Sequence, residues 1–419
     1  MDRKTPDLKR SVNIHPQTDK FNSLLTTNPS KLISLYLHIP FCRYRCSYCD
    51  FNTYTTIGDL QEAYAVGLHQ EVSSVLKGQD RQLSTLFFGG GTPSLMTIPQ
   101  LDHILSAVWQ HVSIPSDFEP EITLEANPET VSLDYLRQLR EIGINRISFG
   151  AQSAQTGDLN VLGREHSFET VIEAVGLARA AGIDNLSIDL IYGVPHQSLE
   201  AWQKTVEVSL ALDLPHYSFY CLTVEPGTAL HRQVNSLQVP SPDPDLAADQ
   251  YDLASELMTQ AGHEHYEISN WSKPGFQSQH NLAYWYNDEY LGLGAGAHGH
   301  ANGVRYHVVK QPRVYLRRMA TGEELTYPLS AAVAGHERLP AEDEMFDTVM
   351  MGLRLLIEGL SDTRFTARFG RSLEDVYGEV IQGLLEEELV EWAISNANRA
   401  LRLTPQGRFV SNQVFHRFL

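Results

Sequence analysis

Strand-like and helix-like patterns alternate along the first half of this chain. Short apolar runs predict strands at 35–39, 83–88, 122–125, 146–149, 186–190 and 217–222. Between most of these runs, apolar residues recur at helical spacing, as in Leu60, Tyr64, Leu68, Val72 and Val75. Such alternation predicts parallel strands with helices packed outside them. Six units are fewer than the eight of a closed TIM barrel, so we expect an α/β fold containing an open, partial (β/α)6 barrel.

Polar residues and glycines collect where the predicted strands end. Glu125, Gln152 and Asp189 lie at or just past strand ends, and the glycines at 89–91 follow the second strand. Barrels and open α/β sheets bind their ligands at this edge. Each residue taken alone would be expected to have a structural role, but their shared edge predicts a binding site.

Three of the four cysteines stand within eight residues, as Cys42, Cys46 and Cys49 in the string SLYLHIPFCRYRCSYCDFN. An odd number of thiols does not suit disulfides. Structural zinc takes four ligands, with His38 or Asp50 available here as the fourth. An iron–sulfur cube usually takes four thiolates, so three would leave one iron open to an exchangeable ligand. We therefore expect an open-iron cluster, with zinc and inert packing as alternatives.

The spacing C-x3-C-x2-C, with Tyr48 before the last cysteine, resembles the signature of the radical SAM superfamily. In that superfamily the open iron binds S-adenosylmethionine (SAM), whose reductive cleavage gives a 5′-deoxyadenosyl radical. The resemblance implies a [4Fe-4S] cluster held by Cys42, Cys46 and Cys49, with SAM at the fourth iron. The cofactor would supply the chemistry, and the protein would bind and orient it.

The same resemblance assigns residues around SAM. It places the Tyr36 hydroxyl near the SAM carboxylate, the glycine turn near the methionyl amino group and Glu125 near the ribose or amino group. Barrel packing is the structural alternative for Tyr36, and a helix cap or a pair with Asp158 is the alternative for Arg164. The residues expected to bind SAM are Tyr36, Tyr48, Gly90, Gly91, Thr92, Glu125, Gln152, Arg164 and Asp189.

The longer string YLHIPFCRYRCSYCDFN resembles two narrower groups, the oxygen-independent coproporphyrinogen III dehydrogenases (HemN) and the HemW-type heme chaperones. The chaperones carry an HNxxYW pattern associated with heme binding, and this chain has HNLAYW at 280–285. Imidazole is a common axial ligand of heme, and aromatic rings offer a macrocycle flat contacts. The resemblance therefore implies heme at His280, Tyr284 and Trp285. Core packing of the aromatics is the alternative, and other histidines would compete as ligands: His263, His265, His298, His300 and His307.

Two features favour the chaperone over the enzyme. The dehydrogenases have a further cysteine two residues after the last cluster cysteine, where this chain has Phe51. The HNxxYW string points the same way. We therefore expect a heme chaperone that passes heme to an acceptor protein. Oxidative decarboxylation of coproporphyrinogen III, or other radical SAM tetrapyrrole chemistry, is the main alternative, and a zinc-stabilised interaction protein is another.

The expected organisation has four parts. Residues 1–33 are polar and lack an apolar leader, which predicts a flexible tail. The barrel would span 34–225 and an α+β extension with the HNxxYW string 226–339. Residues 340–419 resemble the small, mostly helical, winged-helix-like C-terminal domain of HemN.

Composition limits the partners and the compartment. A net charge of −19 argues against binding to nucleic acid, which requires a basic surface. We find no run of 18 apolar residues, and sparse cysteines suit a reducing cytoplasm. We expect a cytoplasmic protein. The sequence does not identify the heme acceptor, and a membrane-associated acceptor stays open.

Overall fold

Six parallel strands form the centre of the fold, as the strand–helix alternation predicts. The computed structural model describes residues 31–115, 118–395 and 398–419, so most of the tail predicted at 1–33 lies outside the described residues. The six strands lie side by side in chain order: β1 (Leu32–Ile39), β2 (Arg81–Gly90), β4 (Glu121–Ala126), β5 (Arg146–Gln152), β6 (Asn185–Tyr192) and β7 (His216–Cys221). The expected α/β partial barrel is confirmed.

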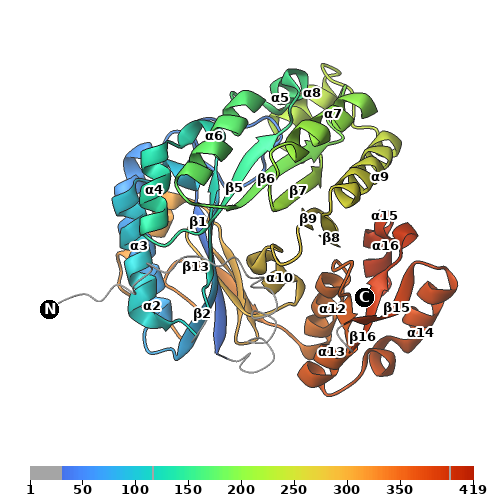
Figure 1. Ribbon diagram of the computed structural model, residues 1–419. Coiled ribbons are helices and arrows are strands. Elements are labelled where there is room, and N and C mark those ends of the chain that lie inside the picture. The colour runs from blue at the N-terminus through green and yellow to red at the C-terminus, as the bar shows by residue number, and fades with distance from the viewer. Residues whose placement is uncertain (1–30, 116–117, 396–397) are drawn as a thin grey trace.

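Helices cover the outer side of this curved sheet (Figure 1). Thr97 and Gln100 form a capping box at the start of α3, and Ser132 and Ser198 cap α4 and α7. The helices of this part are α2 (Gln61–Leu76), α3 (Ile98–His111), α4 (Leu133–Glu141), α5 (Thr156–Leu162), α6 (Phe168–Ala180), α7 (Leu199–Leu210), α8 (Ala229–Asn235) and α9 (Pro244–Gln260), with 3-10 turns η1 (Gly58–Leu60), η2 (Pro93–Leu95) and η3 (Pro128–Thr130).

The segment after β7 lengthens the sheet at both edges. On the β7 edge, β9 (Asn270–Ser272) and then β8 (Glu264–Glu267) continue the sheet with antiparallel pairing. On the other edge, β10 (Tyr290–Leu293) pairs with β1 as a seventh parallel strand, which the sequence did not predict. The remaining elements of this segment are α10 (Gln279–Trp285), β11 (His298–Ala301), β12 (Val304–Val308), α11 (Pro312–Met319) and β13 (Val333–Arg338). The two-residue β3 (Val112–Ser113) pairs with β2.

The barrel strands alternate between apolar and polar residues. In β5, Ile147 and Phe149 belong to the main apolar core, whereas Arg146 and Ser148 line a cavity on the opposite face. Parallel strands that are buried on both faces are usually apolar throughout. The alternation therefore marks a polar barrel interior, with the apolar face packed against the helices.

The C-terminal elements have a separate small core. Val349, Phe365, Leu384 and Leu401 are among its buried residues. The elements are α12 (Ala341–Gly352), β14 (Leu360–Ser361), α13 (Asp362–Phe369), α14 (Leu373–Glu386), β15 (Val390–Ser395), β16 (Asn398–Leu403), α15 (Pro405–Phe409) and α16 (Ser411–His416). Within the described ranges, no helix is both long enough and apolar enough to cross a bilayer.

Candidate functional site

The three-cysteine loop follows β1 at the carboxyl end of the sheet. The backbone N–H of Cys42 donates to the Tyr54 carbonyl at 3.0 Å. In the middle of the loop, the Ser47 N–H donates to the Leu162 carbonyl at 3.0 Å. All three cysteines are free thiols and partly exposed. The loop is thus held at its first cysteine and at its middle, while the thiols stay partly exposed.

Two side chains donate hydrogen bonds to the thiol sulfurs. The Thr92 hydroxyl lies 3.5 Å from Cys42 Sγ, and Arg164 Nη1 lies 3.4 Å from Cys46 Sγ. Arg164 Nη2 also donates to the Asn127 side chain at 2.9 Å and to the Gly150 carbonyl at 2.8 Å. The alternative pairing of Arg164 with Asp158 is therefore wrong, because Asp158 accepts hydrogen bonds from other side chains.

The buried setting of the thiols disfavours free thiolates. Burial raises the pKa of Cys42, and it raises the pKa of Cys49 to about 11. A coordinated metal keeps such thiols deprotonated, and the Arg164 guanidinium offsets part of the negative charge. Among the described residues, no three Cys, His, Asp or Glu side chains converge on the position of a single metal ion. The donor set and its cationic neighbour fit a larger thiolate-bound cluster.

The glycine turn after β2 packs against the chain that leads into the cysteine loop. Gly91 N–H donates to the Ile39 carbonyl at 2.8 Å, and a Cβ on Gly91 would lie 2.7 Å from the Phe41 carbonyl oxygen. Gly90 has a φ of +112°, and a Cβ there would lie 2.5 Å from the His38 ring. Glycine permits both the positive φ and the close approach. The turn therefore brings Thr92 to Cys42.

A cavity of about 210 Å³ lies inside the barrel, and we call it the inner cavity. It brings together five predicted site residues, three from the SAM set and two from the heme set. Its lining residues are Tyr36, Phe87, Glu125, Arg146, Ser148, Asp189, Ser218, Tyr220, His280, Asn281 and Tyr284.

Buried carboxyl groups dominate the electrostatics of the inner cavity. Burial and the nearby charge of Asp189 raise the pKa of Glu125 to about 8, although the Gly90 N–H donates to its carboxylate at 3.1 Å. Burial also raises the pKa of Asp189, and hydrogen bonds from Ser218 and Ser148 oppose that rise. Glu125 is therefore largely protonated at neutral pH in the absence of a ligand and can donate a hydrogen bond into the cavity.

Tyr36 connects the inner cavity to the cysteine loop. Its hydroxyl lies 3.1 Å from His38 Nδ1, and His38 Nε2 lies 3.0 Å from the Asn52 carbonyl. Burial lowers the pKa of His38, so the ring is neutral and can act as donor on one nitrogen and acceptor on the other. His38 thus orients Tyr36 and fastens the far end of the cysteine loop.

His280 forms part of the floor of the inner cavity. It lies in α10 (Gln279–Trp285), and its ring stacks on Phe87 at a centroid distance of 5.0 Å. Its Nδ1 lies 2.7 Å from the Thr85 hydroxyl and its Nε2 2.9 Å from the Tyr284 hydroxyl. Burial lowers the pKa of His280 to about 3. Both ring nitrogens are therefore engaged, and ligation of a heme iron would break one of these bonds.

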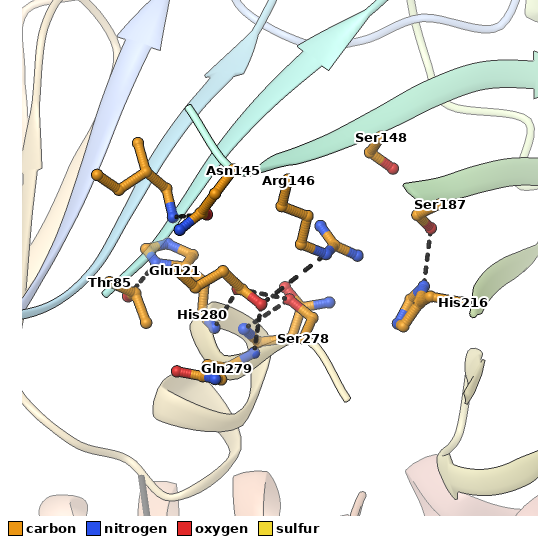
Figure 2. A network of polar contacts seen from close by, with 12 residues as sticks. Thr85, Glu121, Asn145, Arg146, Ser148, Ser187, His216, Ser278, Gln279 and His280 are labelled. Carbon is orange, nitrogen blue, oxygen red and sulfur yellow. Dashed lines mark hydrogen bonds and ion pairs between the residues drawn. The ribbon is translucent and has the colours of Figure 1, made fainter. Parts of the chain in front are cut away.

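A buried acid holds the start of α10 in place, as Figure 2 shows. The Glu121 carboxylate accepts hydrogen bonds from the backbone N–H groups of Gln279 at 3.2 Å and His280 at 3.1 Å. It also lies 3.9 Å from Arg146 Nε. A negative charge at a helix N-terminus is favourable, so Glu121 fixes α10 across the barrel interior.

Trp285 lies apart from the other two residues of the HNxxYW string. It lines a second cavity of about 630 Å³, between the strand starts and the C-terminal elements, which we call the outer cavity. Residues four apart on a helix share a face, as His280 and Tyr284 do, whereas Trp285 is turned away from them. The helix α10 therefore separates the two cavities.

Six predicted SAM residues lie outside the inner cavity: Gly90, Gly91 and Thr92 in the glycine turn, and Tyr48, Gln152 and Arg164. Gln152 ends β5 with a φ of +66°. Its side-chain nitrogen lies so close to Gly150 that a Cβ on Gly150 would be 2.7 Å away. Arg164 lies next to it, at Cys46. Tyr48 packs on a small apolar cluster that includes Leu162. Gln152 and Arg164 thus form the rim between the cavity and the thiols, and Tyr48 also has a packing role.

Sequence reasoning missed several residues of the inner cavity. Arg146, Ser148, Ser218 and Tyr220 stand at alternate positions on their strands, facing inward. The two-residue period that separates them from their apolar neighbours was the available signal. Among the described residues, His280 is the one histidine that lines either cavity, so none of the five competing histidines does.

Comparison with known proteins agrees with this geometry. The sequence model of the radical SAM superfamily matches residues 36–208, and that of the HemN C-terminal domain matches residues 339–410. The heme chaperone HemW of Bacillus subtilis is 36% identical over 387 residues, which cover 92% of this chain and 99% of the relative. The chain belongs to the HemW family of heme chaperones. HemW of Escherichia coli is 33% identical over 389 residues, covering 92% and 98% of the two chains.

The fold of this HemW family member is also that of the related enzyme. The structure of coproporphyrinogen III oxidase (HemN) from Escherichia coli superposes with a TM-score of 0.78 and 22% identity, covering 96% of this chain and 93% of that one. At that identity the likeness shows the fold alone. Phe51 in place of a further cysteine favoured the chaperone, and membership of the HemW family agrees with that prediction. The Phe51 side chain lies beside the cysteine loop and is 62% exposed.

Proposed function

We propose that this protein is a heme chaperone that carries a [4Fe-4S] cluster with SAM at its open iron and delivers heme to an acceptor protein. The observation that carries this proposal is the match to HemW relatives along nearly their whole length. The site supports it, because hydrogen-bond donors lie on the sulfurs of two of the three thiols.

In this proposal Cys42, Cys46 and Cys49 hold the cluster, and the chain's own polar groups hold SAM. Tyr36, Glu125 and Asp189 would face SAM from the inner cavity. Tyr48, Gly90, Gly91, Thr92, Gln152 and Arg164 would surround it at the rim. When bound at the open iron, SAM supplies a source of the 5′-deoxyadenosyl radical. The protein contributes the binding groups, the orientation and the exclusion of water.

The heme would bind beside α10, the helix that carries the HNxxYW string, where the family resemblance assigns His280, Tyr284 and Trp285 as heme contacts. The acceptor is a protein that takes up this heme. Heme is the cargo here, so its site must combine selectivity with release.

The cluster is tested by anaerobic reconstitution of the wild type, the triple variant C42A/C46A/C49A and the matched control C221A. Cys221 is a free, exposed thiol on β7, outside the cysteine loop. We expect iron, sulfide and the visible cluster absorbance in the wild type and C221A, and none in the triple variant. A cluster retained by the triple variant, or zinc in place of iron, would refute the ligand assignment.

The choice between chaperone and enzyme is tested with the same reconstituted protein. Parallel incubations with hemin, and with coproporphyrinogen III plus SAM and a reductant, separate the two functions. We expect saturable hemin binding and no protoporphyrinogen. Conversion of coproporphyrinogen III would instead establish the dehydrogenase, and absence of hemin binding would overturn the chaperone.

A further inference from the structure

The outer cavity has the size of a ligand site. Its volume is about 630 Å³, within the range of roughly 300 to 1,000 Å³ that is usual for sites that bury a small organic molecule. The inner cavity is about 210 Å³, which leaves room for part of SAM, with the remainder at the rim beside the thiols. An intact macrocycle would therefore fit the outer cavity and would not fit the inner one.

Its walls come from parts of the chain that are distant in sequence. The starts of β1 and β2 form one side with Leu32, Ile33 and Ser84, and α12 to β16 form the other. Between them lies the end of α10, with Trp285 and Tyr286. The result is a mostly apolar slot with aromatic rings at its edge, which suits a flat apolar ligand. Three acids also line it, Asp288, Glu289 and Glu358, so the carboxylate of a ligand must lie beside an arginine.

Arginine supplies a charged group at one end of the slot. Arg364 Nη2 donates to Asp288 Oδ1 at 3.2 Å and Oδ2 at 3.4 Å, and its guanidinium lies 4.0 Å from the centre of the Tyr286 ring. Both hydrogen bonds use the same nitrogen. Within the described residues, Nη1 and Nε therefore remain available for a second carboxylate, which guanidinium binds well.

Two buried polar atoms on residues that line the cavity have no hydrogen-bond partner among the described residues. They are the Ser84 hydroxyl oxygen, on a residue 3% exposed, and the Trp285 indole nitrogen. Buried polar groups are rarely left unsatisfied in native proteins. Neither atom is exposed to the cavity, so both are unsatisfied groups within its wall and contribute no contact to a ligand.

We propose that the outer cavity, not the His280 face of α10, holds the heme. The macrocycle lies against Trp285 and Tyr286, and one propionate binds Arg364. No histidine, cysteine or methionine lines this cavity in the described chain, and the hydroxyl of Tyr286, which does line it, is engaged by Glu358. Heme held by its face and its propionate has no iron–protein bond to break on transfer, which suits a carrier. This inference rests on the proposed chaperone function and adds the location of the cargo.

The test is a hemin titration of matched variants of the full chain, followed by absorbance. R364Q removes the proposed propionate contact. R399Q is its control, because Arg399 likewise pairs with an acid, Glu374, and lies 3.7 Å from the Trp392 ring, but does not line the cavity. We expect R364Q to weaken hemin binding about tenfold or more, as for the loss of one charge-assisted hydrogen bond, and R399Q to leave it unchanged.

A second pair tests the face contact. W285L removes the proposed flat contact, and W392L is its control, since each indole lies beneath an arginine. Hemin dimethyl ester, whose propionates are blocked, serves as a probe of the carboxylate contact. We expect W285L to weaken binding of both hemin and the ester, whereas R364Q weakens binding of hemin alone.

The outcomes separate the two levels of the proposal. Wild-type protein that fails to bind hemin overturns the chaperone function itself. A second outcome is that the wild type binds hemin, R364Q and W285L bind it with wild-type affinity, and H280Q does not bind it. This outcome overturns the outer-cavity assignment and leaves the chaperone function intact. Circular dichroism of each variant verifies that it is folded.

Discussion

The two cavities on either side of α10 differ in size and in how much of their lining is apolar. The inner cavity is about 210 Å³ and is lined by ionisable groups, including Glu125, Arg146 and Asp189. The outer cavity is about three times larger, at about 630 Å³, and its walls are mostly apolar. A small polar site beside a thiol loop suits a polar cofactor, and a large apolar slot suits a macrocycle. The helix α10, which carries the HNxxYW string, contributes residues to both cavities.

The HNxxYW string is divided between these two cavities. His280 Nε2 and the Tyr284 hydroxyl form a hydrogen bond of 2.9 Å, and both residues line the inner cavity. Trp285 lines the outer cavity. The string is continuous in sequence, but the helix distributes it over two surfaces. The role of each residue then follows from the cavity that it lines.

Removal of the acid that anchors α10 should have the largest effect on both cavities. E121A leaves Arg146 without its charged partner and frees the N-terminal amides of the helix. Breaking a buried ion pair typically costs about 3 to 5 kcal/mol. We expect a loss of that order in denaturant unfolding, together with faster hydrogen exchange across 279–285.

The control for that variant is E374A, which breaks an exposed pair with Arg399. Exposed pairs contribute about 0 to 1 kcal/mol, so E374A should change little. Equal effects of E121A and E374A would mean that Glu121 does not anchor the helix.

The charge of the inner cavity should appear in the pH dependence of stability of the cluster-free chain. The pKa of Glu125 is raised to about 8, well above its ordinary value, so its contribution to stability is complete below about pH 4.5 and is lost as the pH rises towards 8. Each pKa unit corresponds to about 1.4 kcal/mol, and we expect a fall on the order of 2 to 4 kcal/mol between pH 5 and 8. E125Q should flatten this fall in unfolding free energy, and an unchanged slope in E125Q would contradict the assignment.

His280 tests whether the two cavities are functionally separate. H280Q should lower stability by about 1 to 2 kcal/mol through its lost hydrogen bonds and leave hemin affinity within about threefold of wild type. H216Q is a close control, because His216 also has both ring nitrogens beside hydroxyl groups. Its Nδ1 lies 2.7 Å from the Ser187 hydroxyl, as Figure 2 shows, and its Nε2 lies 2.9 Å from the Tyr266 hydroxyl. Loss of hemin binding in H280Q but not in H216Q would make His280 the heme ligand.

Two serines provide the smallest and most specific contrast. Ser148 donates to Asp189 at 3.2 Å in the inner cavity, whereas the Ser84 hydroxyl in the outer cavity is unpartnered among the described residues. In the heme-free chain, removal of the Ser148 hydroxyl should lower the free energy of unfolding by about 1 kcal/mol. Removal of the Ser84 hydroxyl should leave it unchanged or raise it by up to about 1 kcal/mol. Thermal unfolding of S148A and S84A measures this. A destabilised S84A would show that its hydroxyl is already satisfied.

The sequence predicted the parallel barrel because periodicity and strand–helix order depend on local residues. It did not predict β10, a four-residue strand whose partner β1 lies far away in sequence, so no local pattern reports their pairing. It also did not separate Trp285 from His280, although helical geometry alone places them on different faces.

The thiol loop was predictable and its surroundings were not. Three cysteines at fixed spacing carry their chemistry in the sequence. The contacts of Arg164 with Cys46 and of Thr92 with Cys42 depend on how separate strand ends meet in space. The outer cavity is formed by segments from the start of β1 to β16, and no single motif describes such a surface.

The most direct test of the account is hemin affinity measured with and without saturating SAM on anaerobically reconstituted protein. If SAM occupies the inner cavity and heme the outer one, the two ligands bind together and the dissociation constant for hemin is unchanged by SAM. If heme instead binds at His280, it shares the inner cavity with Tyr36, Glu125 and Asp189, and SAM displaces it. Competition between the two ligands would therefore contradict the separation of the two cavities.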